Sequence, residues 1–522
     1  MTLAKSATKI GKLSTIYFVG ALLPQLTSIV VLPIYTEYLS KEQMGVFNLA
    51  SRVAAPLSVL IQLGAMAGFK SWYFRTDEAL RPQLVRTMQV GQIGVNLAMI
   101  ALLAVLGLMW VDAILPGLPM SWAALYVMWL MILGDCFGDA QSRLASSSAR
   151  LREHAFTSLA LSLSKYAVQT ILGLGLVFWL ANAGMGEWQG FGRVAVSLVA
   201  SLAISLFAFR LNWRYGGGRF DPTMFTQTLR TSIKFVPHQL SDTLLQTANA
   251  WMVNGLFSTA TLGVYGVAVG FASLVQMPLT NFSDAAYPTL SKLMREGSAE
   301  GKRQQARIYT LTLLMLVAAV LIQQLFSTVV IRVLTNPAYH EAALVVPILI
   351  FAWLFQAFYA IVVQPVFYFG GGLWLSTATI SSIVVSVGVG ILSIPEHGMY
   401  GAAWSMAAGF AAKFIVAATA STYLYRLPWE LTKISLGLAC ALLVAWIDWA
   451  YVDGLLDVVN TANQPGGFWQ RVEWTNLIVM VGAKLALLAT IVPLWWITGV
   501  VTTKELAYGR DLVRGKLRAM RG

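Results

Sequence analysis

Long apolar segments follow one another along almost the whole chain, separated by short polar connections. Fourteen of them have the roughly 20 mostly apolar residues that a membrane-spanning helix needs. They are residues 14–38, 45–69, 88–111, 119–141, 155–180, 192–212, 234–257, 263–289, 308–333, 342–369, 373–394, 399–425, 433–453 and 475–500. Because backbone polar groups inside a bilayer must be hydrogen-bonded within the segment, the pattern predicts an all-α polytopic membrane protein with 14 transmembrane helices.

Lys and Arg residues gather on one side of these spans. With the N-terminus in the cytoplasm, the cytoplasmic connections hold 28 of the 36 basic residues and the opposite connections hold four. The positive-inside rule therefore predicts that both termini are cytoplasmic. The net charge of +13 is spread over many connections rather than concentrated in one patch, so it does not indicate a nucleic-acid partner.

A short motif occurs twice, in "LSKEQMGVFNLA" (39–50) and "FSTATLGVYGVA" (257–268), and each copy joins the first two spans of a six-span block. Since six is even, both blocks enter the membrane in the same direction, which predicts a parallel repeat about an axis along the membrane normal. The expected parts are two six-helix lobes, 1–213 and 214–430, then two extra helices, 431–500, and a basic cytoplasmic tail, 501–522.

Four stretches, "YLSKEQMGVFNLA", "LGVYGVAVGF", "AAYPTLSKLMREG" and "GMYGAAWSMAAGFAAKF", resemble the Wzx-type polysaccharide-transporter flippases. These belong to the MOP superfamily, with the MATE exporters and the lipid II flippases. The resemblance implies two lobes that rock to give alternating access. It also implies an undecaprenyl-diphosphate-linked oligosaccharide as substrate, moved from the cytoplasmic to the outer leaflet of a bacterial inner membrane. A polysaccharide polymerase and a chain-length regulator are the implied protein partners.

Four basic residues, Arg52, Lys165, Lys413 and Lys484, lie inside expected spans. A charge at that depth requires water, a counter-ion or a ligand. A cationic cavity would suit a diphosphate, because Arg offers a planar fork to phosphate oxygens and Lys a mobile point charge. We expect Arg52, Lys165 and Lys413 to bind substrate, with Asn48 one turn before Arg52. For neutral polar residues such as Asn48, the alternative is hydrogen bonding between packed helices.

Asp242 and Asp284 lie in the seventh and eighth spans and are candidates for ion coupling. A buried carboxylate can exchange a proton or hold Na⁺, so the expected coupling ion is H⁺ or Na⁺, and no other cofactor or metal site is expected. The alternative is that they pair with Lys165, Arg52 or Lys413. For Asp135 and Asp139, pairing with Arg143 is favoured over catalysis.

Spans 13 and 14 carry few charges, and Lys484 is a candidate residue of a groove for the polyprenyl tail; simple lateral packing is the alternative. An enzyme is not expected, because no outer connection is long enough for a catalytic domain. The competing function is a MATE-like, ion-coupled exporter of organic cations, which would require a net acidic cavity.

Overall fold

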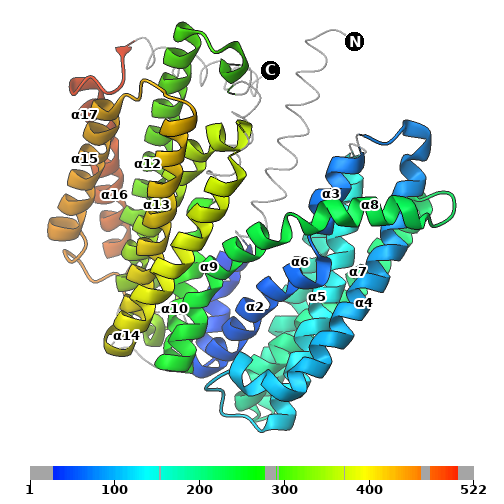
Figure 1. Cartoon of the computed structure of the whole chain (residues 1–522). Helices are drawn as coiled ribbons and strands as arrows, with labels where there is room; N and C mark the ends of the chain where they lie inside the picture. The colour runs from blue at the N-terminus through cyan, green and yellow to red at the C-terminus, as the bar shows by residue number, and fades with distance from the viewer. Residues whose placement is uncertain are drawn as a thin grey trace, which may run out of the picture. The chain divides into compact units, whose positions relative to one another are not determined.

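The computed structural model describes residues 27–73, 75–151, 154–276, 290, 293–369, 371–459 and 471–503. In these ranges the chain forms helices joined by short connections (Figure 1). The only β pairing within them is an isolated bridge between Val459 and Val472. The expected all-α class is confirmed.

The helices before the first cytoplasmic-facing connection helix and that helix itself are α2 (Lys41–Gln62), α3 (Ala65–Tyr73), α4 (Arg81–Ile114), α5 (Trp122–Leu151), α6 (Ala155–Asn182), α7 (Gln189–Tyr215) and α8 (Pro222–Ile233). They are followed by α9 (Val236–Leu256), α10 (Thr259–Ala272), α12 (Ala299–Leu334), α13 (Ala342–Tyr368), α14 (Gly372–Leu424), α15 (Leu431–Ile447), α16 (Trp474–Ala489) and α17 (Ile491–Ile497).

Ten helices among the described residues are long and apolar enough to cross a membrane. The long helix α14 covers two expected spans, and Gly398, with φ 52° and ψ −123°, turns the chain between them. The expected break near residue 370 is also present, because α13 ends at Tyr368 and α14 begins at Gly372. The number of fourteen spans stays a prediction, since 14–26 and 277–289 lie outside the described residues.

The second expected span, 45–69, is divided into two helices. Leu63 and Gly64 have positive φ values of 46° and 67°, so the right-handed helix cannot continue through them. A Cβ atom on Gly64 would crowd the carbonyl oxygen of Ser232, at the end of α8. The expectation of one uninterrupted helix was therefore wrong.

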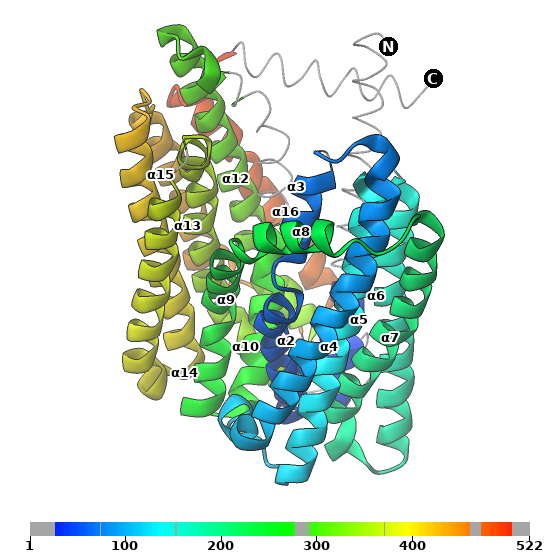
Figure 2. The same ribbon diagram turned by 45° about the vertical axis from the view of Figure 1, so that its right-hand side comes forward.

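The connection after α7 contains a helix of its own, α8. Asp221 caps its N-terminus by accepting hydrogen bonds from the backbone N–H groups of Thr223 and Met224, at 2.8 and 3.1 Å. The helix lies across α3 and α4 (Figures 1 and 2). The indole nitrogen of Trp72 donates to the Thr231 hydroxyl at 3.0 Å, which ties α3 to α8.

The chain divides into two compact units. The first comprises Met1–Gly270 and Ser376–Ala412, and the second comprises Phe271–Leu375 and Lys413–Gly522. Within the first unit α5 packs against α2, α4, α6 and α7, and within the second unit α12 packs against α13, α15 and α16 (Figure 2). The boundaries of the expected lobes and of the added helices stay predictions.

The two copies of the repeated motif meet inside the first unit, where α2 contacts α10. A Cβ atom on Gly45 would overlap the carbonyl oxygen of Thr259, and one on Gly263 would overlap that of Lys41. Gly263 and Thr259 each follow their repeat equivalents, Gly45 and Lys41, by 218 residues. The two contacts are therefore the same contact with the copies exchanged, as in a self-complementary two-fold interface. The repeat seen in the sequence is a local pseudo-symmetry of the structure.

Candidate functional site

The basic residues inside the spans differ in what neutralises them. An isolated charge in hydrocarbon costs about 3 kcal/mol on insertion scales, so its surroundings indicate its role. Lys165 and Lys484 have carboxylate partners, and Lys413 lies over an aromatic ring. Arg52 has neither kind of partner among the described residues.

Arg52 lies in the middle of α2 and is partly buried. In the described part of the chain its guanidinium makes no hydrogen bond or ion pair, and its electrostatic neighbour is the buried phenol of Tyr265 on α10. The expectation that Asp242 or Asp284 might pair with Arg52 is not met, and Asp284 itself lies outside the described residues. Arg52 thus offers five N–H donors that the described chain does not use.

Asn48, one turn before Arg52, is part of the crossing between the repeats. Its side-chain amide donates to the carbonyl oxygen of Gly263 at 3.4 Å. A Cβ atom on Gly266, its repeat equivalent, would overlap this amide, so a large side chain in one copy faces a glycine in the other. The geometry supports the alternative reading of Asn48 as a contact between helices; its substrate-binding role stays a prediction.

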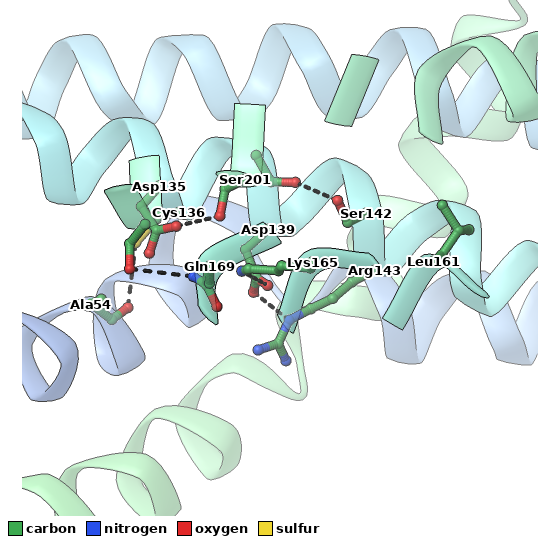
Figure 3. A network of polar contacts seen from close by, with 12 residues as sticks. Ala54, Asp135, Cys136, Asp139, Ser142, Arg143, Leu161, Lys165, Gln169 and Ser201 are labelled. Carbon is green, nitrogen blue, oxygen red and sulfur yellow. Dashed lines mark hydrogen bonds and ion pairs between the residues drawn. The ribbon is translucent and has the colours of Figure 1, made fainter. Parts of the chain in front are cut away.

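Lys165 belongs to a charged network in which α5, α6 and α7 meet (Figure 3). Its Nζ lies 2.8 Å from Asp139 Oδ1, and Arg143 Nε lies 2.5 Å from Asp139 Oδ2. The favoured pairing of Asp139 with Arg143 is confirmed. The expectation that Lys165 pairs with Asp242 or Asp284 was wrong, because α6 packs against α5 and presents Lys165 to Asp139.

Small residues on α5 allow this network to form. A Cβ atom on Gly138 would collide with the backbone of Ser201, so α5 and α7 touch directly at that level. The Ser201 hydroxyl donates a hydrogen bond to Asp135. On the next face, the thiol of Cys136 donates to the carbonyl oxygen of Ala54 at 3.4 Å (Figure 3). The network is thereby joined to α2 two residues beyond Arg52.

Lys413 is almost completely buried, with 1% of its surface exposed. Its Nζ lies 4.3 Å from the centre of the Tyr359 ring, within the range of a cation–π contact, in the second unit. An aromatic cluster surrounds it, since Phe355 and Phe358 contact Phe414 next to it. Lys413 stays a predicted substrate ligand, and this position would have to open before a ligand reached it.

Asp242, on α9, is partly buried and accepts a hydrogen bond from Gln246 at 3.4 Å. One turn further, Asn249 accepts hydrogen bonds from Ser405 at 2.8 Å and Ser386 at 3.4 Å. These three side chains are buried and join α9 to both halves of α14. The polar stripe of this span is therefore partly a helix–helix contact, and the coupling role of Asp242 stays a prediction.

Lys484 is fully buried between two carboxylates. Its Nζ lies 2.7 Å from Asp448 and 2.9 Å from Asp453. Asp448–Val452 forms a π-helical turn, and the backbone N–H of Asp453 donates to the carbonyl of Asp448 at 2.7 Å. This i→i+5 turn places both carboxylates on one side. The arrangement accounts for Lys484 without a ligand, and its place in a groove for lipid stays a prediction.

We expect Lys484→Met to destabilise the protein by about 3–5 kcal/mol, because it leaves two buried carboxylates without their cation. Thermal unfolding of the purified protein in detergent measures the effect. Lys433→Met is the matched control: Lys433 pairs with Glu430 at 2.6 Å on the same helix pair but is partly exposed, so its loss should cost about 0–1 kcal/mol. Equal unfolding temperatures for the two variants would contradict a buried-charge role for Lys484.

The interpretation of the sequence missed a group of buried amides between α2, α4 and α5. Gln92 donates to the carbonyl of Gln62 at 3.2 Å and to Asn96 at 2.6 Å. Gln89 and Gln141 complete the group, and all five residues are at most 7% exposed. The spacing of Gln89, Gln92 and Asn96 along the third span was a detectable signal, since residues three, four and seven apart share a helix face.

Taken together, a multi-pass helical bundle with ion pairs and buried amides inside its spans is the architecture of a membrane transporter. The similar solved structures are flippases and transporters, not enzymes. The lipid II flippase MurJ in an inward closed conformation has a TM-score of 0.68 at 12% identity, over 95% of this chain and 100% of that chain. An inward-facing multidrug resistance MATE family transporter has a TM-score of 0.52 at 14% identity, over 79% and 93%. For the Vibrio cholerae MATE transporter VcmN the values are 0.51, 13%, 81% and 98%.

Residues 10–294, more than half of the 522, match the model of a family described as polysaccharide biosynthesis protein, and the chain belongs to this family. A search of curated proteins found no match. The resemblance to the MOP superfamily is confirmed, and with it the reading of this protein as a transporter of the flippase type.

Proposed function

We propose that this protein is a flippase for an undecaprenyl-diphosphate-linked oligosaccharide, such as an O-antigen, capsule or exopolysaccharide repeat unit. It moves the lipid from the cytoplasmic to the outer leaflet by alternating access of two lobes, coupled to H⁺ or Na⁺. Membership of a polysaccharide biosynthesis family supports the glycan, and the fold shared with the lipid II flippase MurJ supports transport of a lipid-linked precursor.

The observation that carries the proposal is the unpaired guanidinium of Arg52. Lys165 and Lys484 are neutralised by carboxylates and Lys413 is covered by an aromatic ring. The positive charge left without a carboxylate in the described spans is that of Arg52. A diphosphate provides the paired oxygens that an arginine fork recognises, and binding it removes the cost of an isolated charge.

A MATE-like exporter of organic cations is the second candidate, because the fold is also similar to MATE transporters. Such an exporter needs a carboxylate that attracts a cation. Asp139 is held by Lys165 and Arg143, and Asp448 is held by Lys484. These ion pairs favour the anionic cargo over the cationic one.

The distribution of basic residues supports a bacterial inner-membrane location with both termini in the cytoplasm. The expected partners act on the glycan after it has crossed: a polysaccharide polymerase and a chain-length regulator on the outer side. The membrane supplies the substrate itself.

Deletion of the gene tests the function. The expected result is accumulation of the lipid-linked glycan in the cytoplasmic leaflet, measured by a leaflet-resolved assay, and its return to the outer leaflet when the gene is supplied on a plasmid. Unchanged glycan in both leaflets, together with increased sensitivity to cationic drugs, would contradict the flippase and support the exporter.

A further inference from the structure

Asp135 and Asp139 lie one helical turn apart on α5 but have opposite kinds of partners (Figure 3). Asp139 makes two ion pairs, with Lys165 at 2.8 Å and Arg143 at 2.5 Å. Asp135 accepts a hydrogen bond from the neutral hydroxyl of Ser201. In the described chain, no nitrogen of a basic side chain lies within ion-pair distance of Asp135. Two chemically identical groups are thus held in different electrostatic settings.

The partners decide which carboxyl group can accept a proton. Lys and Arg side chains are donors only, so a protonated Asp139 would present its new O–H to groups that cannot accept it. A serine hydroxyl both donates and accepts. Ser201 can therefore donate to an ionised Asp135 and, after rotation of its O–H, accept from a protonated one. Its position is fixed in both states by the close approach of α5 and α7 at Gly138.

The charges around Asp135 also favour exchange at that residue. The ionisable and polar groups facing it are Cys136, Asp139 and Arg143 on its own helix, Lys165 on α6, Ser201 on α7 and the Ala54 carbonyl bound by Cys136 on α2. The ionisable residues of α4, which also packs on α5, are Arg81, Arg86 and Asp112, close to its ends. With Asp135 ionised, the two aspartates balance Lys165 and Arg143; with Asp135 protonated, one positive charge remains.

We propose that Asp135 is the residue that binds and releases the coupling proton, while Asp139 stays ionised and holds Lys165 and Arg143 in place. The assignment rests on the proposed function for the meaning of coupling. The step is a simple protonation: a proton from water binds a carboxylate oxygen of Asp135, the carboxylate becomes a neutral acid, and Ser201 reverses its hydrogen bond. No other bond forms or breaks. The net charge beside Lys165 changes by one unit.

The test uses the purified full-length protein in lipid nanodiscs, without substrate. Infrared spectroscopy as a function of pH follows the carbonyl stretch of protonated carboxyl groups. The expected result is a pH-dependent band that disappears in Asp135→Asn and persists in Asp112→Asn, a control at an exposed aspartate of α4. Ser201→Ala, which keeps the carboxyl group, should shift the midpoint of the same band. A band unchanged in both Asp135→Asn and Ser201→Ala would overturn the assignment.

Transport provides a second, separate readout. With a lipid-linked glycan in proteoliposomes, we expect Asp135→Asn to lose the response of transport to an imposed pH gradient, while protein content stays constant. A gradient response that Asp135→Asn retains would also overturn the assignment. If wild-type protein moves no lipid-linked glycan, the proposed function fails, but the infrared measurement still decides whether Asp135 titrates.

Discussion

Arg52→Ala is expected to abolish transport of the lipid-linked glycan while the protein remains in the membrane at its normal level. The guanidinium makes no ion pair or hydrogen bond in the described chain, so its removal breaks no internal contact of that kind. If it binds a diphosphate through a charged, bidentate contact, the loss of about 3 kcal/mol corresponds to roughly 100-fold weaker binding. The leaflet-resolved assay in cells that carry the variant measures this loss.

Arg52→Lys should retain part of the activity, because it keeps the charge but not the planar fork. Arg230→Ala is the matched control, since Arg230 is an exposed arginine on α8 and its removal should leave transport unchanged. Normal transport by Arg52→Ala would refute the anion site. Loss of the Arg52→Ala protein from the membrane would show instead that the arginine is structural.

Gly263→Ala is expected to prevent normal assembly of the first unit. A Cβ atom at this position would overlap the carbonyl oxygen of Lys41 and come within 3.1 Å of the backbone nitrogen of Gly45. The obstructing atoms belong to the backbone, so they cannot rotate away as a side chain would. Overpacking of a close contact typically costs about 1–3 kcal/mol, and forced separation of α2 from α10 adds the loss of the Asn48 contact. Size-exclusion chromatography and thermal unfolding of the purified variant measure the effect.

The matched control is Gly270→Ala on the same helix, because a Cβ atom there meets no atom within 4 Å. It should leave yield and unfolding temperature unchanged. By the pseudo-symmetry of the repeat, Gly45→Ala should behave like Gly263→Ala, since it meets the carbonyl of Thr259 in the same way. If Gly263→Ala matched Gly270→Ala in stability, the close contact between the repeat copies would be refuted.

Much of the architecture could be predicted from the sequence because it depends on local properties. Length and apolarity set the spans, and the break between α13 and α14 is visible as Gly370-Gly371-Gly372. The repeated motif also pointed to Gly45 and Gly263, which the structure places at a contact between the two copies. The break in α2 at Leu63 was missed, because leucine does not usually adopt a positive φ and only Gly64 marked the site.

The candidate site was only partly predictable, because the partners of a charge lie on other helices. Helical spacing identified Lys165 as an intramembrane cation, but not that α6 would present it to Asp139. The second partner of Lys484 was also missed. Asp448 and Asp453 are five residues apart, which puts them on different faces of a regular α-helix, and only the π-helical turn aligns them.

The sequence by itself determined that this chain is a polytopic helical membrane protein with a parallel repeat and four basic residues inside its spans. These conclusions follow from apolar length and the distribution of basic residues, which act segment by segment. Only the tertiary structure decided which of those charges are neutralised, because an ion pair depends on distances between helices. It placed Lys165 and Lys484 against carboxylates, and left Arg52 without a carboxylate in the described chain.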